Sequence, residues 1–179
     1  MGNALVGSAP QAIHPIEYYL SDVGEFQFIC SLGSTRFLKV AKCGHYEGEC
    51  VVKVLALEDP SLPLATHKQR IELLSSETVR NVSIAAFHRA SIHPNFALIA
   101  RQYVRYSLYD RLSTRPFLTV VEKCWLAFQL IKCMEWCHQR GIHHGDIKVD
   151  NILITSSLWL IITDFATYKP VFLPDVSPL

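Results

Sequence analysis

The feature that most constrains this chain is a polar loop followed by two short apolar runs. The loop reads HHGDIKVDN over residues 143–151, and the apolar runs at 152–155 and 158–163 flank two serines. Apolar runs of this length, separated by turn residues, predict a β-hairpin. Antiparallel pairing brings the start of the first strand beside the end of the second. We therefore expect Asn151, directly before the hairpin, and Asp164, directly after it, to lie together.

These polar residues suggest chemistry at a phosphate. A carboxylate beside a carboxamide offers hard oxygen ligands that suit Mg²⁺, which usually keeps waters and takes substrate phosphates as further ligands. Asp146 precedes the same strand and is placed to accept a hydrogen bond from a hydroxyl group. Lys148 lies two residues on, where its charge would stabilise a phosphoryl group in transfer. The string alone also fits an ordinary solvated turn.

Composition narrows the class of protein. The chain has 179 residues, of which 50% are hydrophobic and 18% charged. This composition can form a core and argues against the disordered class. A net charge of +1 without a Lys/Arg block argues against nucleic acid as a partner. Six cysteines without a CxxC pair, and eight histidines without HExxH, predict free thiols and argue against a metalloenzyme or hydrolase.

Local patterns predict a strand-rich first part with one helix inserted, followed by a helical part and then the hairpin. Apolar and β-branched runs predict strands at 26–29, 37–40, 50–55 and 96–99. Helical spacing predicts helices over 67–74, 108–112 and 120–140, and Gly141 is placed to cap the last of these. This order suggests two lobes of different class, α+β overall, joined near residues 103–107.

Three segments together resemble the protein kinase family. Residues 144–151, HGDIKVDN, resemble the H-R-D-x-K-x-x-N catalytic loop, and 164–166, DFA, resemble D-F-G. Residues 51–53, VVK, resemble the strand that carries the phosphate-pairing lysine. The resemblance implies a bilobal kinase-like fold. An antiparallel-sheet N-lobe would occupy 26–104 and an incomplete helical C-lobe 105–179, after a leader over 1–25.

The same resemblance implies ATP and Mg²⁺ as cofactors and a protein serine or threonine hydroxyl as the phosphoryl acceptor. Asp146 would be the catalytic base with Lys148 beside it, and Asn151 and Asp164 would hold the metal.

The remaining implied residues would bind the nucleotide. Lys53 would hold the α- and β-phosphates, steadied by Glu72 or, failing that, by Glu77. Gly33 would belong to the glycine-rich loop over the phosphates. Backbone groups of Gln102, Tyr103 and Val104 would face the adenine.

A narrower resemblance points to the regulatory kinase subunits of the class III phosphatidylinositol 3-kinase complex. It is carried by four stretches: LGSTRF at 32–37, DPSLPL at 59–64, LYDRLSTRPFL at 108–118 and HGDIK at 144–148. It implies the catalytic subunit of that complex and its regulatory partners as binding partners, with roles in endosomal sorting and autophagy. The start, Met1-Gly2-Asn3, fits that family's N-myristoylation, so a lipid on Gly2 would hold a cytoplasmic protein peripherally on endosomal or autophagic membranes.

Several positions depart from the kinase pattern. Thr35 and Leu38 stand where the phosphate loop would have glycines, and Gly145 replaces the arginine of H-R-D. Arg101 stands where an apolar residue usually closes the adenine pocket, and Ala166 replaces the D-F-G glycine. These departures favour the alternative function, a pseudokinase-like scaffold that binds nucleotide and partner subunits.

The chain also stops thirteen residues after Ala166. We expect a fragment, a truncated isoform or an incomplete gene model, in which the helix over 120–140 exposes an apolar face.

Overall fold

The computed structural model describes residues 14–34, 38–56, 69, 72, 76, 81–85, 87–93 and 96–165. The chain divides into two compact units, which are described separately below. The first comprises 1–62 with 89–100, and the second comprises 63–88 with 101–179.

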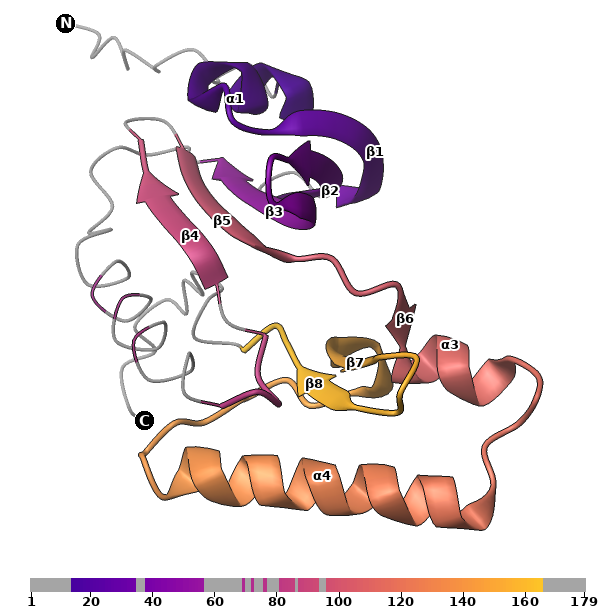
Figure 1. Ribbon diagram of the computed structural model, residues 1–179. Helices are drawn as coiled ribbons and strands as arrows, with labels where there is room; N and C mark the ends of the chain where they lie inside the picture. The colour runs from indigo at the N-terminus through magenta and orange to yellow at the C-terminus, as the bar shows by residue number, and fades with distance from the viewer. Residues whose placement is uncertain are drawn as a thin grey trace, which may run out of the picture. The chain divides into compact units, whose positions relative to one another are not determined.

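A five-stranded sheet forms the body of the first unit, with strand order β1-β2-β3-β5-β4 (Figure 1). Its strands are β1 (Gln27–Ser34), β2 (Leu38–His45), β3 (Gly48–Ala56), β4 (Phe87–Ile92) and β5 (Phe96–Gln102). The strands predicted at 26–29, 37–40, 50–55 and 96–99 are confirmed, and each is longer than predicted. β4 was not predicted, because its sequence FHRASI mixes polar residues into the run, as edge strands often do.

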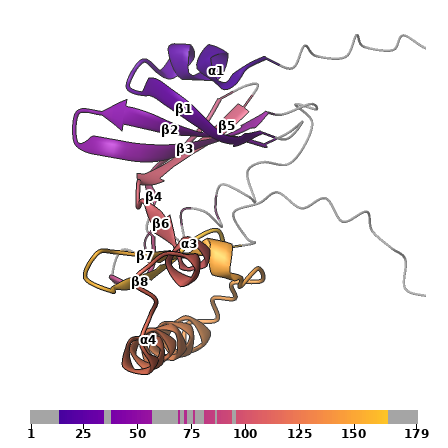
Figure 2. The same cartoon turned by 90° about the vertical axis from the view of Figure 1, so that its right-hand side faces the viewer.

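Helix α1 (Ile16–Val23) packs on one face of this sheet (Figure 2). The leader predicted over 1–25 therefore contains a helix that the sequence analysis did not predict. The signal was present, because Ile16, Tyr19 and Leu20 follow the i, i+3, i+4 spacing of a buried helix face. Gly24 ends the helix in a left-handed conformation, φ 70°, and donates its N–H to the carbonyl of Leu20.

The second unit holds a small antiparallel sheet with strand order β6-β7-β8. Its elements are β6 (Tyr106–Ser107), α3 (Leu108–Ser113), α4 (Val120–His138), the 3-10 turn η1 (Val149–Asn151), β7 (Ile152–Ile154) and β8 (Leu160–Ile162). The predicted hairpin and the predicted helices at 108–112 and 120–140 are confirmed, so the α+β class holds. β6 went unpredicted, because two residues carry no periodic signal. The helix expected over 67–74 falls almost wholly outside the described residues.

Both ends of α4 are capped by local chemistry. The Thr119 side chain accepts from the backbone N–H of Glu122, whose carboxylate accepts from the Thr119 N–H, which is a complete capping box. At the other end Gly141 adopts φ 67°, as predicted for a cap, and Ile142 donates its N–H to the carbonyl of Cys137 at 2.9 Å.

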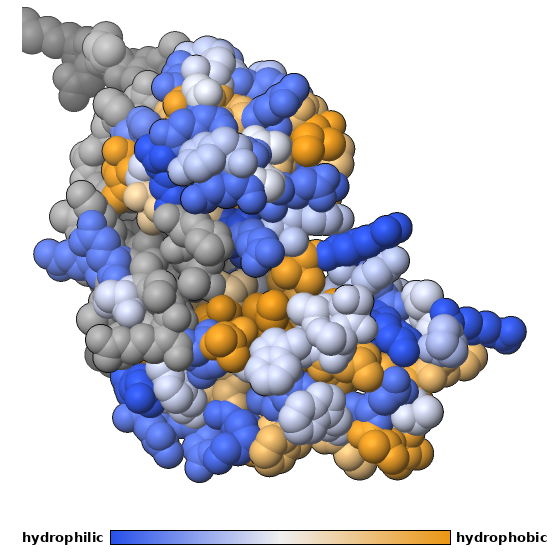
Figure 3. Space-filling view, in the orientation of Figure 1, coloured by the Kyte–Doolittle hydropathy of each residue, from blue (hydrophilic) through white to orange (hydrophobic). Residues whose placement is uncertain are grey.

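The buried face of α4 carries a polar anchor for the hairpin. Buried Gln129 donates from Nε2 to the Leu158 carbonyl at 2.9 Å, and its Oε1 accepts from the Leu160 N–H at 3.0 Å. One side chain thus satisfies two backbone groups of the β7–β8 turn. Apolar residues on other faces of the helix stay exposed, including Val121, Phe128 and Ile131, and hydrophobic atoms appear at the surface beside its first turns (Figure 3). The expected exposed apolar face is present. Among the helices described, none is long and apolar enough to span a bilayer.

Candidate functional site

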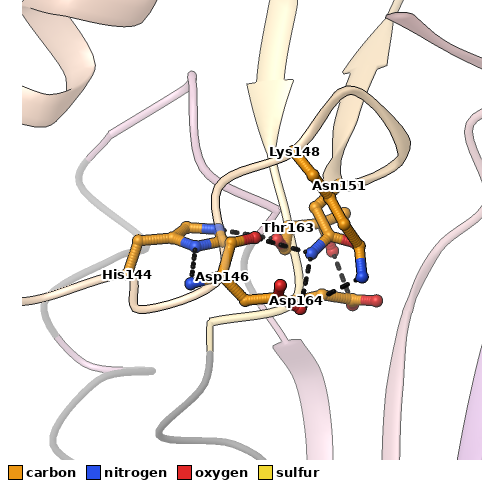
Figure 4. Close-up of polar contacts among 6 residues, drawn as sticks. All are labelled: His144, Asp146, Lys148, Asn151, Thr163 and Asp164. Carbon is orange, nitrogen blue, oxygen red and sulfur yellow. Dashed lines mark hydrogen bonds and ion pairs between the residues drawn. The ribbon is translucent and has the colours of Figure 1, made fainter. Parts of the chain in front are cut away.

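Asn151 and Asp164 lie at the same end of the β7–β8 hairpin, as their sequence positions predict (Figure 4). Ile152 pairs with Ile162, so the residues flanking the two strands meet beyond this pair. Thr163 donates its N–H to the Asn151 carbonyl at 2.9 Å, which continues the ladder by one bond. The hairpin therefore positions the two proposed metal ligands through ordinary antiparallel pairing.

The amide of Asn151 is oriented by Asp146. Its Nδ2 donates to the Asp146 carbonyl at 2.8 Å and to the carboxylate Oδ2 at 3.0 Å. Asn151 is buried, so this pairing also satisfies a polar group that burial would otherwise penalise. With the nitrogen committed to Asp146, the amide oxygen Oδ1 is the atom left to serve as a cation ligand.

His144 joins the loop to the segment after β8. The Asp146 N–H donates to Nδ1 of His144 at 3.2 Å, so Nδ1 accepts and the ring proton belongs on Nε2. Nε2 then donates to the Thr163 carbonyl at 2.9 Å. The ring is 2% exposed and lies 4.5 Å from the ring of Phe165, centroid to centroid. A neutral buried imidazole thus holds Asp146 and the Asp164 segment in register.

Gly145 makes this arrangement possible. Its φ of 74° lies in the left-handed region that side chains disfavour. The reversal there turns the backbone N–H of Asp146 back toward His144. Glycine at the position of the H-R-D arginine adopts this conformation without the cost that a side chain would add.

Charge at the site is partly paired. Lys148 Nζ lies 3.3 Å from Asp146 Oδ2, and both side chains remain partly exposed. Thr163 Oγ1 donates to Asp164 Oδ1 at 3.2 Å. Asp164 holds φ 63°, a strained conformation for a residue with a side chain. Such strain is maintained only where the surroundings determine the backbone, here through the buried neighbours Thr163 and Phe165.

The donor set fits Mg²⁺. The Asp164 carboxylate and the Asn151 amide oxygen are both hard oxygen ligands. Across the residues that the structure describes, no group of three or more His, Cys, Asp or Glu side chains forms a closed metal cage. A two-ligand site leaves the other coordination positions of the ion to waters and phosphate oxygens, which is the usual manner of Mg²⁺ at nucleotide sites.

The expected nucleotide residues of the first unit lie on its sheet. Lys53 is half-buried on β3, and its neighbours Val52 and Val54 are fully buried on the opposite face. Gly33 is exposed near the end of β1, and a Cβ built on it would meet no atom within 4 Å. Packing in the described part of the sheet therefore does not require glycine at that position.

The structure describes only some of the other predicted site residues. Glu72, which belongs to the second unit, is helical and exposed. Glu77 and Gly2 lie outside the described residues. Tyr103 and Val104 are half-buried beyond β5.

Arg101 changes the environment of the predicted adenine-facing backbone. Its guanidinium is buried, with Nη1 donating to the Gln102 carbonyl at 3.1 Å, while Nε has no hydrogen-bond partner among the described atoms. Burial lowers the pKa of Arg101, and the Asp164 carboxylate acts in the opposite direction. One of the carbonyl groups expected at the adenine is thus already bonded to a buried cation.

Sequence reasoning did not single out His144 or Thr163 as functional residues. The signal available was their type and position, a histidine before the loop aspartate and a hydroxyl residue before Asp164. Only the three-dimensional arrangement shows that the two residues bond to each other.

Comparison with known proteins gives consistent matches. The family described as protein kinase domain matches residues 26–171. Serine/threonine-protein kinase VPS15 of Arabidopsis thaliana is 38% identical over 183 residues, which cover 99% of this chain and 12% of that protein. Serine/threonine-protein kinase VPS15 of Saccharomyces cerevisiae is 37% identical over 161 residues, which cover 89% of this chain and 11% of that protein. The probable serine/threonine-protein kinase vps15 of Dictyostelium discoideum is 39% identical over 169 residues, covering 90% of this chain and 8% of that protein. The chain therefore spans only a small part of the length of these relatives.

Proposed function

This chain belongs to the protein kinase family, and from that premise we propose that its domain transfers the γ-phosphoryl group of ATP to a serine or threonine hydroxyl of a protein. The observation that carries the proposal is the bonded set of Asp146, Asn151 and Lys148 at the end of the hairpin that also presents Asp164. A base, a metal-ligating pair and a phosphate-binding cation are the groups that phosphoryl transfer requires.

Each residue has a defined task in this proposal. The Asp146 carboxylate accepts the proton of the attacking hydroxyl, while that oxygen bonds to the γ-phosphorus and the bond to ADP breaks. Asn151 holds Asp146 through its two hydrogen bonds. Lys148, beside the same carboxylate, offers its charge to the moving phosphoryl group. Asn151 and Asp164 would hold Mg²⁺, which would neutralise phosphate charge when bound. Lys53, Gly33, Glu72 and the 102–104 backbone are proposed to hold the nucleotide.

The test uses radiolabelled ATP, Mg²⁺ and a general protein acceptor. Asp146→Asn is expected to abolish phosphate incorporation, because an amide does not accept the hydroxyl proton as a carboxylate does. Asp150→Asn is the matched control, since it removes an exposed carboxylate of the same segment, and it is expected to retain activity. Equal incorporation by wild type and Asp146→Asn would remove Asp146 from this role.

One observation favours a second function, a scaffold that binds nucleotide without turning it over. Arg101 is a buried cation within electrostatic range of Asp164. A fixed positive charge near a metal ligand opposes the binding of a divalent ion. An ATP-dependent rise in melting temperature, with no phosphate incorporation by wild type, supports the scaffold. Incorporation that requires Asp146 supports the kinase, and the absence of both effects contradicts both functions.

The similarity to the VPS15 proteins is the basis for proposing partners and a location. We propose that the protein acts in the class III phosphatidylinositol 3-kinase complex, with the catalytic subunit and its regulatory partners, in endosomal sorting and autophagy. A myristoyl group on Gly2 would hold it on the cytoplasmic side of endosomal or autophagic membranes. Mass spectrometry of the N-terminal peptide tests the lipid, with Gly2→Ala as control. Co-purification of the lipid kinase subunit tests the complex.

A further inference from the structure

A pocket of about 320 Å³ opens on the second unit, away from the residues assigned above. It lies where the end of α3, the start of α4 and the turn of the β7–β8 hairpin meet. Its volume reaches the lower part of the range typical of ligand pockets, roughly 300 to 1,000 Å³. The proposed phosphotransfer uses none of its lining residues, so the pocket needs its own explanation.

The pocket lining has more positively than negatively charged side chains. Arg111 and Arg115 face a single acid, Glu122. Arg111 is held in place, because its Nη1 donates to the carbonyls of Thr114 at 3.3 Å and Pro116 at 2.8 Å. Arg115 is exposed, so its charge is accessible to a ligand. The lining therefore carries one net positive charge.

Glu122 reduces the attraction of the two arginines for an anion but does not reverse it. Its Oε2 accepts from the N–H of Thr119 at 2.7 Å and from the Thr119 hydroxyl at 2.8 Å, so the carboxylate serves the N-cap of α4. Those hydrogen bonds hold the pKa of Glu122 below its usual value, which keeps it ionised. The Glu122 carboxylate beside the two guanidinium groups is thus ionised and hydrogen-bonded to Thr119 at the start of α4.

The rest of the lining combines apolar side chains with hydroxyl groups. Leu158 and Pro116 present hydrocarbon surface, while Ile154 is almost fully buried. Hydroxyl groups come from Tyr106, Thr114, Thr155 and Ser156. A phosphate carries close to two negative charges and no hydrocarbon, so it exceeds the single net charge and leaves Leu158 and Pro116 without an apolar partner. A carboxylate next to an apolar side chain matches both features.

We propose that this pocket docks an acidic segment of a partner protein. A glutamate or aspartate carboxylate pairs with Arg115 and Arg111, and a neighbouring apolar side chain packs against Leu158 and Pro116. Arg115 supplies a bidentate fork for the carboxylate, and Arg111 supplies a fixed positive charge behind it.

The probe is the acetylated and amidated peptide Gly-Leu-Glu-Leu-Gly, whose only charge is one carboxylate. It is titrated into the full ¹⁵N-labelled 179-residue chain at low salt. Twin peptides carry Gln or Lys in place of Glu. The Glu peptide is expected to shift the signals of Ser156 and Arg115 and to bind about tenfold more tightly than its Gln twin. Equal binding of the Glu and Gln peptides, or tighter binding of the Lys peptide, overturns the proposal.

Two variants change affinity in opposite directions. Arg115→Glu is expected to weaken the Glu peptide about tenfold or more. Glu122→Gln keeps the capping box, because glutamine serves at that position, and removes the one opposing charge, so it should tighten binding several-fold. Lys123→Ala, an exposed cation on the same helix outside the lining, is the control and should leave affinity unchanged.

Further outcomes would contradict the proposed ligand or its location. Weaker binding by Glu122→Gln contradicts the proposed acidic ligand. Displacement of the Glu peptide by equimolar inorganic phosphate assigns the pocket to simple anions instead. Amide spectra of each variant establish that the fold is retained, and a peptide shift that maps away from Ser156 overturns the location.

Discussion

The side-chain amide of Asn151 donates to two oxygens of Asp146, the backbone carbonyl at 2.8 Å and the carboxylate Oδ2 at 3.0 Å (Figure 4). Two residues with separate proposed tasks, a metal ligand and a base, are thereby held as one unit. The position of the base depends on the ligand, so changes at Asn151 should affect stability as well as chemistry.

Asn151→Ala is expected to lower the free energy of unfolding by roughly 1–3 kcal/mol, because it removes the donor to the Asp146 carbonyl. Asn151→Asp should cost more, since it replaces the donor with a second carboxylate facing the first. Urea denaturation measures both, with Asp150→Asn as an exposed control on the same turn. If Asn151→Ala matches the control, the pair does not support the loop.

Substitutions at His144 can distinguish the contribution of its hydrogen bonds from that of its packing against Phe165. His144→Phe retains a ring against Phe165 but loses the bond to the Thr163 carbonyl. We expect a loss of roughly 1–3 kcal/mol for that variant and a larger loss for His144→Ala, which also leaves a cavity. Thermal and urea denaturation measure the difference. Wild-type stability in His144→Phe would show that the imidazole bonds contribute little.

Arg101 is expected to reduce stability. Its charge is buried with Nε unpaired in the described structure, so Arg101→Met should raise the free energy of unfolding by roughly 1–3 kcal/mol. The same variant should also strengthen binding of Mg²⁺ with ATP, because a cation near Asp164 is removed. Arg105→Met, at an exposed arginine beside Tyr106, is the control. A lower melting temperature in Arg101→Met than in the control would contradict the prediction.

Cys43 should make the fold sensitive to alkali. Burial, followed by the neighbouring thiols Cys50 and Cys30, raises its pKa from 9.0 to about 12. Between these pH values the unfolded thiol ionises and the folded thiol does not, so stability present below pH 9 is lost as pH rises toward 12.

Melting temperatures at increasing pH test this effect. Cys43→Ala is expected to start less stable, because it leaves a cavity, but to lose less stability as the pH rises from 9. The exposed Cys124→Ala should follow wild type throughout. Parallel curves for wild type and Cys43→Ala would contradict the assignment to Cys43.

Much of the candidate site follows from local sequence. Asn151 and Asp164 flank a hairpin whose pairing is set by two short apolar runs, so their meeting needs no information from distant parts of the chain. The helix over Val120–His138 and its end at Gly141 are local in the same sense, since periodicity and a left-handed glycine specify them.

Contacts between segments that are distant in sequence could not be predicted from local patterns. α1 has the spacing of a buried helix, yet its role depends on the sheet that it covers. The buried anchor of α4 is Gln129, while Phe128 and Ile131, which are more apolar, stay exposed. Hydrophobicity alone would predict burial of Phe128 and Ile131. Gln129 is buried instead because its side-chain amide hydrogen-bonds to the Leu158 carbonyl and the Leu160 N–H.

The sequence by itself determined the family, the class of fold and the hairpin that carries Asn151 and Asp164, because these depend on residue types and spacings along the chain. Only the tertiary structure decided the neutral bridge of His144 to Thr163 and the burial of Arg101. The physical reason is that burial and hydrogen bonding depend on which groups lie opposite in space, and distant segments supply those groups.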